Sequence, residues 1–288
     1  MRAYDERDQF EPSENSDSSV SPPTKRRPRF ILAPLIIALI FMAVQYFGAS
    51  TYTNPETGKT VRVALSPEQE EALGLQSFNE ITSQSDLVTS GPEYDQVQRV
   101  VKRLIKGVDQ SSQNFEWAVS VIRGDEVNAF CLPGGKIAVY TGILPVAQND
   151  AGLAAVIGHE IAHATLHHGA QRMLQQQLVQ TGLQGVNGSF SDYDYNQRRL
   201  IMGVLGAGAQ FGLVLPYGRN HELEADRMGL VYLARAGYDP EEAVRFWERM
   251  DATGSSQQPP EWASTHPSHG SRIQRLKEII ASGTLPAS

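Results

Sequence analysis

The sequence predicts an α+β protein that is mostly helical, contains a small β-sheet and is preceded by one transmembrane helix. Three observations lead to this prediction. An uncharged apolar run covers residues 30–48, short segments rich in β-forming residues follow between Trp117 and Thr141, and helical patterns dominate from Asp150 onward. An order of helices, a few strands and then more helices is typical of α+β domains.

The composition argues against a nucleic-acid-binding protein and excludes an internal disulfide. The chain has 288 residues, a formal net charge of −7 and 41% hydrophobic residues. Nucleic-acid-binding surfaces are usually basic, so no nucleic-acid partner is expected. Cys131 is the single cysteine, and it is predicted to be a small, buried apolar residue rather than a redox or zinc switch.

Residues 1–29 are predicted to be a disordered cytoplasmic tail, because Asp, Glu, Ser, Pro and Arg dominate there. Residues 30–48, FILAPLIIALIFMAVQYFG, follow as 19 residues without a charge. At about 1.5 Å per residue they nearly span a hydrocarbon core of about 30 Å, so the lipid bilayer is an expected partner. Four of residues 25–29 are Lys or Arg, which predicts that the rest of the chain lies across the membrane. A cleaved signal peptide ending near Ser50 is the alternative.

The remaining chain divides into a linker at residues 49–65 and a domain at residues 66–284. The segment Ser66-Pro67-Glu68-Gln69 predicts a helix start with a capping box. Apolar residues at helical spacing predict a second helix over residues 94–108. Strands are expected at residues 117–122, 127–132 and 136–141, with turns between them, and another helix is expected to begin at Asp239-Pro240-Glu241-Glu242.

A second apolar run, LIMGVLGAGAQFGLVL, covers residues 200–215 and includes four glycines and Gln210. The favoured interpretation is a buried helix in close contact with another helix. The alternative is a helix that dips into the membrane near the active site.

The central motif is His159-Glu160-Ile161-Ala162-His163. Histidines four positions apart share one face of a helix, so both rings can reach a single zinc ion. Glu160 lies next to the first ligand and is placed to accept a proton from zinc-bound water. Apolar residues surround the motif on most sides of the predicted helix, and buried histidines and carboxylates require partners such as a metal.

Zinc needs a third protein ligand. One subclass of such enzymes places a third histidine six residues after the second, but that position is Gly169 here. A later segment, RNHELEAD, offers Glu222 as a ligand and Asp226, four residues on, to hold the far nitrogen of a ligand histidine. In isolation this segment also fits a solvated acidic helix face with ordinary ion pairs.

Four stretches resemble the zinc peptidase family that includes the heat-shock peptidase HtpX and the CaaX prenyl endopeptidase. The resemblance is strongest to the branch of the mitochondrial OMA-type peptidase and the bacterial β-barrel assembly-enhancing peptidase. It implies a zincin-like metallopeptidase domain with one Zn²⁺, the ligands His159, His163 and Glu222, the base Glu160, and the supporting Asp226. The stretches are NAFCLPGGKIAVYTGIL (128–144), AAVIGHEIAHATLHHG (154–169), LPYGRNHELEADRMGL (215–230) and STHPSHGSRIQRL (264–276).

Further site residues are expected on the same basis. By the family pattern, His266 either stabilises the developing oxyanion or sits on zinc as a removable fourth ligand; a helix-entry histidine bonded to backbone is the alternative. Arg272 is expected to orient the loop of His266. The predicted strand Lys136, Ile137, Ala138, Val139 and Tyr140 is expected to pair with an extended substrate. His167, His168, His221 and His269 are expected to be structural or exposed.

These expectations together predict a membrane-anchored zinc endopeptidase. It would cleave unfolded or misassembled proteins as part of protein quality control in the cell envelope. The alternative is a zinc-binding membrane protein with a chaperone-like or partner-binding role and latent proteolysis. A bacterial inner membrane with the catalytic domain in the periplasm is favoured over the mitochondrial inner membrane, because residues 1–29 do not resemble a transit peptide.

Overall fold

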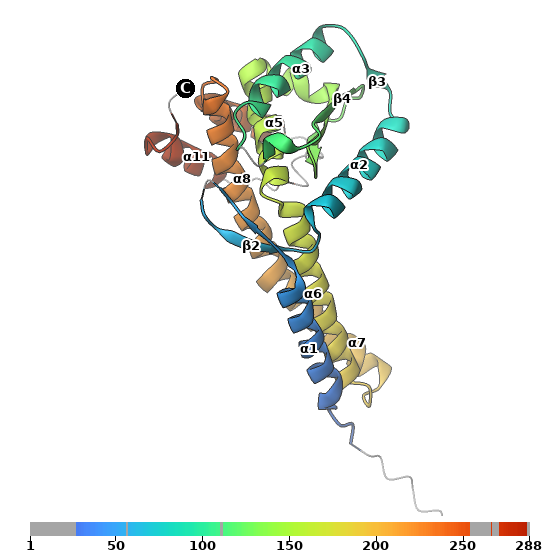
Figure 1. The fold of residues 1–288 in the computed structure, drawn as a ribbon. Coiled ribbons are helices and arrows are strands. Elements are labelled where there is room, and N and C mark those ends of the chain that lie inside the picture. Colours follow the sequence, from blue (N-terminus) through green and yellow to red (C-terminus); the bar gives the residue numbers. More distant parts are fainter. Residues whose placement is uncertain (1–26, 56, 110–111, 254–265, 267–270, 287–288) are drawn as a thin grey trace, which may run out of the picture.

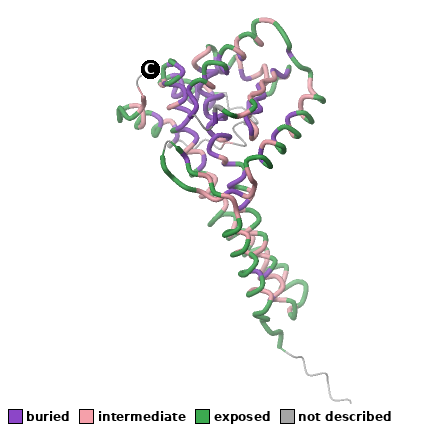
Figure 2. Tube along the Cα trace, in the orientation of Figure 1, coloured by how far each residue is buried: buried purple, intermediate pink, exposed green. Residues whose placement is uncertain are grey.

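The chain folds into a head, which holds a small β-sheet and the central helices, and a stalk of helices that projects from it (Figure 1). The computed structural model describes residues 27–55, 57–109, 112–253, 266 and 271–286. Buried residues gather in the head, whereas the stalk is mostly exposed or intermediate (Figure 2).

The stalk contains α1 (Leu32–Gly48), α6 (His168–Ser189) and α7 (Tyr195–Ala209). A π-helical turn, Gln210–Val214, joins α7 to α8 (Leu215–Arg235), so that residues 195–235 form one continuous helix. Among the described residues, this is the helix that is long and apolar enough to cross a membrane, and α1 is a shorter apolar helix. The run at residues 30–48 is therefore helical as predicted.

The hairpin of β1 (Ser50–Thr53) and β2 (Thr60–Val63) occupies the segment where the sequence predicts a linker. Next comes α2 (Pro67–Ser83), whose N-terminus has the predicted capping box: the Ser66 side chain accepts from the Gln69 backbone, and the Gln69 side chain accepts from the Ser66 backbone. The second predicted helix is α3 (Pro92–Ile105), which begins and ends slightly earlier than its apolar periodicity suggests.

The sheet contains β3 (Leu87–Val88), β4 (Ala118–Ile122), β5 (Ala129–Leu132) and β6 (Lys136–Tyr140). Its order is β3-β4-β6-β5, with β4 and β6 parallel and the other pairs antiparallel. The three predicted strands are confirmed. The two-residue β3 is too short to leave a pattern in the sequence. In this order β6 is an interior strand and β5 is an edge strand.

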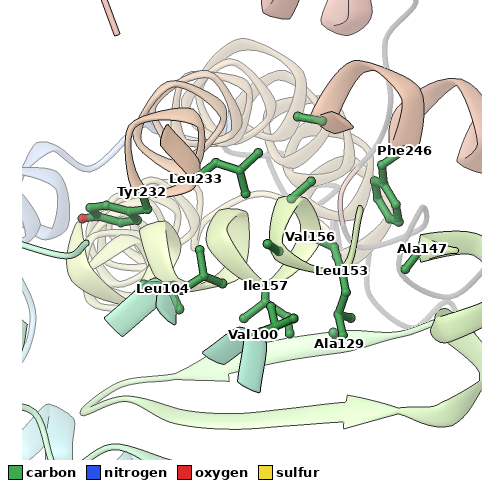
Figure 3. Packing of buried hydrophobic residues seen from close by; sticks show 14 of the residues in the cluster. Val100, Leu104, Ala129, Ala147, Leu153, Val156, Ile157, Tyr232, Leu233 and Phe246 are labelled. Atoms are coloured by element: carbon green, nitrogen blue, oxygen red, sulfur yellow. The ribbon is translucent and has the colours of Figure 1, made fainter. Parts of the chain in front are cut away.

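The core is built around α5 (Asp150–Thr165), which begins with Asn149 capping the backbone of Gly152 and is buried along almost its whole length. In Figure 3, Leu153, Val156 and Ile157 of α5 lie between α8 and the layer formed by α3 and the sheet. Shorter elements complete the head: Ser112–Asn114, Thr141–Ile143, α4 (Leu144–Ala147), α9 (Glu241–Thr253) and α11 (Ser271–Ala281). The predicted helical character after Asp150 is thus confirmed.

Two glycines allow α5 and α8 to cross closely. A Cβ atom on Gly229 would lie 3.1 Å from the backbone nitrogen of His159, and one on Gly158 would lie 3.4 Å from the carbonyl oxygen of Gly229. Glu222, Asp226 and Gly229 follow one another at helical spacing, so they share the face of α8 that meets α5. The crossing therefore sets how far the carboxylates of α8 stand from the histidines of α5.

The favoured interpretation of residues 200–215 as a buried helix was wrong. Their outward side chains are strongly exposed, for example Leu200 at 70% and Phe211 at 71%, and none of the most apolar 18-residue window is buried. The error arose because an apolar run in a water-soluble domain normally marks a core helix, whereas here the run projects away from the head on the stalk.

Replacing Gly229 with leucine is predicted to destabilise the head. The new side chain would have to push α5 and α8 apart, and overpacking of this kind costs about 1–3 kcal/mol. Gly218 is the matched control, because it lies in the same helix with open space around it. In detergent, Gly229→Leu should unfold at clearly lower denaturant concentration than wild type. Gly218→Leu should unfold at the same or a slightly higher concentration, since leucine favours a helix more than glycine does. Equal midpoints for the two variants would contradict this account of the crossing.

Candidate metal centre

His159 and His163 lie on one face of α5, as the four-residue spacing predicts. Their Nε2 atoms are 3.1 Å apart, and both rings are inside the head. Burial and the neighbouring His159 hold the pKa of His163 well below its ordinary value, so this ring is neutral and has a lone pair available. Two imidazoles whose Nε2 atoms converge on one point are what a zinc ion requires from this helix.

Glu222 of α8 reaches the same point from the other side. Its carboxylate oxygens lie 3.4 Å from Nε2 of His159 and 3.5 Å from Nε2 of His163. Ligands about 2.1 Å from a tetrahedral ion stand roughly 3.4 Å from one another, so the three side chains are spaced as ligands of a single ion. The hydrogen bonds with His159 and His266 outweigh burial and hold the pKa of Glu222 far below its usual range, so it is a carboxylate.

His266 joins this group from the C-terminal region. Its Nδ1 atom lies 3.1 Å from Glu222 and 3.4 Å from Nε2 of His159. The four potential ligand atoms of His159, His163, Glu222 and His266 all fall within 4.8 Å of one another. The structure therefore brings His266 to the metal position itself, as one of the two family-based interpretations anticipates.

Asp226 and Arg272 lie behind His159. The Nδ1 atom of His159 is 3.0 Å from Oδ1 of Asp226, and Arg272 donates to the same oxygen through Nε at 2.9 Å and also through Nη2. Burial alone would raise the pKa of Asp226, but Arg272 and His159 outweigh it and keep the carboxyl ionised. Arg272 also stacks 3.4 Å from the ring centre of Trp247. Its contacts thus fix Asp226 and His159. Residues 267–270, which follow His266 in the sequence, lie outside the described residues, so the expected role of Arg272 in orienting that segment stays a prediction.

His168 and Glu224 lie behind His163 in a similar way. The two Nδ1 atoms of His163 and His168 are 3.0 Å apart, Nε2 of His168 is 3.4 Å from Glu224, and Lys59 pairs with Glu224. A neutral imidazole donates from one ring nitrogen and accepts at the other. Because His168 donates from Nε2 to Glu224, its Nδ1 atom accepts a hydrogen bond from Nδ1 of His163. His163 therefore directs the lone pair of its Nε2 atom toward the metal position. The bonds to His168 and Lys59 lower the pKa of Glu224 to about 2, which keeps it an acceptor.

The residues are consistent with a zinc centre because every donor is of a type that zinc prefers. Burial and Arg272 lower the pKa of His159, yet the hydrogen bonds with Asp226 and Glu222 outweigh them and raise it to about 9. An excess of negative charge in the pocket is the cause, and a divalent cation satisfies that charge. Glu160 is buried beside this cluster, with Oε1 3.6 Å from Nε2 of His266.

The expected role of residues 136–140 as the substrate-pairing strand was wrong. This segment is β6, and its two edges are occupied by β4 and β5. The ammonium group of Lys136 is buried against the backbone carbonyls of Glu116 and Gly134. Because three adjacent strands were predicted without their order in space, the sequence could not show which of them lies at the edge.

Two site residues had no predicted role at the metal. His168 was expected to be structural or exposed, and it is buried against His163 and stacked on His221 with ring centres 4.2 Å apart. Glu224 was not singled out. His168 follows the left-handed turn at His167, so helical spacing from His163 cannot place it. His167 itself bonds to Glu70, and His269 lies outside the described residues.

Comparisons with known proteins agree with this geometry. The family model described as "Peptidase family M48" matches residues 93–280, which is more than half of the chain. The chain belongs to peptidase family M48. It is 37% identical over 191 residues to the mitochondrial metalloendopeptidase OMA1 of Schizosaccharomyces pombe, covering 64% of this chain and 52% of that protein. Its identity to human OMA1 is 31% over 248 residues, covering 82% and 47% of the two chains.

A bacterial relative gives a similar match within the family. The β-barrel assembly-enhancing protease of Escherichia coli is 29% identical over 249 residues, covering 84% of this chain and 50% of that protein. The chain spans about half the length of the curated relatives it matches. The family and branch suggested by the four sequence stretches are therefore confirmed.

His168→Ala is predicted to weaken zinc binding. Loss of a group that orients a metal-bound histidine typically costs about 10–100-fold in metal affinity. The adjacent His167 provides a control, since it bonds to Glu70 and is not part of the cluster; asparagine is suitable there because it tolerates the left-handed backbone. Competition against a chelator should show weaker zinc binding for His168→Ala and wild-type affinity for His167→Asn. Unchanged affinity in both would remove His168 from the centre.

Proposed function

We propose that this chain is a zinc-dependent endopeptidase held in a membrane by α1. The observation that carries the proposal is the meeting of His159, His163 and Glu222 at tetrahedral ligand spacing with Glu160 beside them. Membership of peptidase family M48 and the names of the relatives support it. The uncharged helix α1, preceded by a basic cluster, supports the anchor.

The chemistry follows from the side chains around the metal position. Zinc bound there supplies the Lewis acidity that peptide hydrolysis needs. Glu160 accepts a proton from the attacking water and delivers it to the leaving amine. Asp226 and His168 hold the two ligand histidines in the tautomer that presents Nε2 to the metal.

His266 gives the site a resting state. With zinc held by His159, His163 and Glu222, the Nδ1 atom of His266 would be close enough to act as a fourth ligand, in the place that the attacking water and the substrate carbonyl need. This placement favours the removable ligand over a role as an oxyanion donor. Activation would then require His266 to move away from this position while His159, His163 and Glu222 continue to hold the ion.

The substrate is an extended polypeptide that pairs with the edge of β5. Tyr140 donates its backbone N–H to Asn128, so alternation along the antiparallel pair directs the backbone groups of Ala129 and Cys131 to the open edge. β5 packs against α5, the helix that carries Glu160, and this contact supports a position of the edge near the base. Among the described residues, no strand covers that edge.

Unfolded or misassembled proteins fit such a site, because pairing through the backbone requires a free, extended segment. Protein quality control in the bacterial envelope, with the head in the periplasm, is the proposed setting; the mitochondrial inner membrane is the alternative.

A chaperone-like zinc protein with latent proteolysis is the second candidate function, favoured by the position of His266 beside the three expected ligands. A casein digestion assay with and without a chelator separates the two candidates. Digestion that stops when the chelator is added supports the endopeptidase, and absence of digestion supports the chaperone-like protein.

Glu160→Gln should abolish casein cleavage and leave zinc bound. Glutamine keeps the size of the side chain but cannot accept the proton. Zinc content by mass spectrometry and cleavage by gel should be measured on the same preparation. Residual turnover near the wild-type rate would refute the role of Glu160 as the base.

His266→Ala should raise the basal rate of casein cleavage, since it vacates the fourth position, and should leave about one zinc per chain. A rate that falls with zinc retained would instead support the oxyanion role. A rate equal to that of wild type would remove His266 from the reaction.

Cys131→Pro should slow cleavage while zinc affinity stays the same, because proline removes an outward N–H from the edge strand without removing a bond inside the sheet. Cys131→Ala is the control for loss of the thiol and should cleave casein like wild type. Equal rates for the two variants would exclude pairing at this edge.

A further inference from the structure

The stalk is a bundle of three helices held together at both of its ends. At the far end, the backbone N–H of Ile31 donates to Ser189 at 2.9 Å, and Arg198 donates to Asn187 at 2.9 Å across the α6–α7 hairpin. Nearer the head, Thr181 bonds to Gln45 at 3.1 Å and Gln175 donates to the carbonyl of Leu213 at 3.0 Å. The three helices therefore run side by side over the same length (Figure 1).

The three helices share one neutral zone. Residues 30–48, 173–191 and 200–218 each contain 19 residues without a single Asp, Glu, Lys, Arg or His. The chain as a whole is 20% charged, so these 57 residues would contain about 11 charges at that average; ordinary soluble domains contain about 25%. At about 1.5 Å per residue, 19 residues span about 28 Å, close to the thickness of a hydrocarbon core.

Charges return at both limits of this zone. Arg62, Arg172 and Arg219 lie where the stalk meets the head, and Asp192, Asp194, Arg198 and Arg199 lie at the tip of the hairpin, at the same end as Arg29. A neutral zone with charges confined to its two ends is the distribution that a bilayer imposes.

The outer surface of the stalk suits lipid. Outward side chains of α7 and its π-helical turn are large and apolar, as are those of α1, and so many exposed apolar side chains are unfavourable in water. They include Ile36, Ile37, Ile40, Phe41, Val44, Phe47, Leu200, Val204, Leu205, Phe211 and Leu213. The outward face of α6 differs, because it carries the amides of Gln176, Gln180 and Gln184; these are uncharged, and membrane helices use such groups for hydrogen bonds.

The contact between α1 and α6 has the small residues that membrane helices use for close packing. A Cβ on Gly185 would overlap Ala38, one on Gly188 would lie 2.8 Å from Pro34, and one on Gly182 would lie 3.5 Å from the sulfur of Met42. These glycines let the two backbones approach along the neutral zone.

We propose that the α6–α7 hairpin enters the bilayer alongside α1, so that the chain crosses the membrane three times with the hairpin tip on the side of the N-terminal tail. The proposal rests on the anchoring role of α1 in the proposed function. Glu222 lies four residues beyond Gly218 in α8, about 6 Å along the helix axis. The metal centre is then at the membrane surface, and its substrates are polypeptide segments that emerge from the bilayer.

Cysteine accessibility in the full-length chain tests this topology. A Cys131→Ala background removes the native thiol, and single replacements Ser18→Cys, Thr57→Cys, Ser191→Cys and Val204→Cys report on the tail, the β1–β2 turn, the hairpin tip and the middle of α7. Bacterial membrane vesicles of both orientations are treated with a membrane-impermeant maleimide. A cooperative thermal unfolding transition in detergent, at a temperature close to that of wild type, shows that each variant is folded.

We expect Ser191→Cys to react from the same side as Ser18→Cys, Thr57→Cys to react from the opposite side, and Val204→Cys to stay unlabelled from both. Reaction of Ser191→Cys from the side of Thr57→Cys, with Ser18→Cys opposite, overturns the three-pass topology while α1 remains an anchor. Labelling of Val204→Cys as fast as Thr57→Cys overturns it as well. Reaction of Ser18→Cys and Thr57→Cys from one side removes the anchor itself, and with it the three-pass topology and the membrane part of the proposed function, while the zinc site is left untested by this result.

Discussion

The close crossing of α5 and α8 is the constraint on which the metal centre depends. One helix carries both histidines and Glu160, the other carries Glu222 and Asp226, and neither set is a site without the other. Gly158 and Gly229 remove the side chains that would hold the two backbones apart. Packing around α5 then makes this geometry rigid, because its apolar faces are covered by α3, α8, α9 and the sheet.

Burial makes a metal ion the natural partner of this pocket. With the ligand histidines neutral, as metal binding requires, the carboxylates of Glu160, Glu222 and Asp226 and the guanidinium of Arg272 leave a formal charge of −2. A buried excess of charge is unfavourable unless it is paired, and one divalent cation neutralises it. Asp226 with Arg272, and His168 with Glu224, fix the two ligand rings from behind.

Residues that act through local spacing could be predicted from the sequence. The capping box at Ser66, the three strands and the histidines of α5 belong to this group. Helical spacing offered Glu222 and Asp226 beside the alternative of an acidic helix face, the family resemblance favoured them, and the family pattern alone pointed to His266. Positions set by packing over long distances could not be predicted: the interior place of β6, the contact of His168 with His163, and the exposure of residues 200–215. Each of these depends on which element lies beside which, and hydropathy alone does not record that.

The head and the stalk meet next to the site, since α6 begins at His168 and α8 continues from the apolar helix into Glu222. This arrangement requires that His159, His163 and Glu222 bind one zinc ion. A crystal structure of zinc-loaded protein with anomalous data at the zinc edge would show whether they do. We predict a single peak within bonding distance of both Nε2 atoms and the Glu222 carboxylate. A peak on His168, His221 and Glu224 instead, or none in the head, would contradict it.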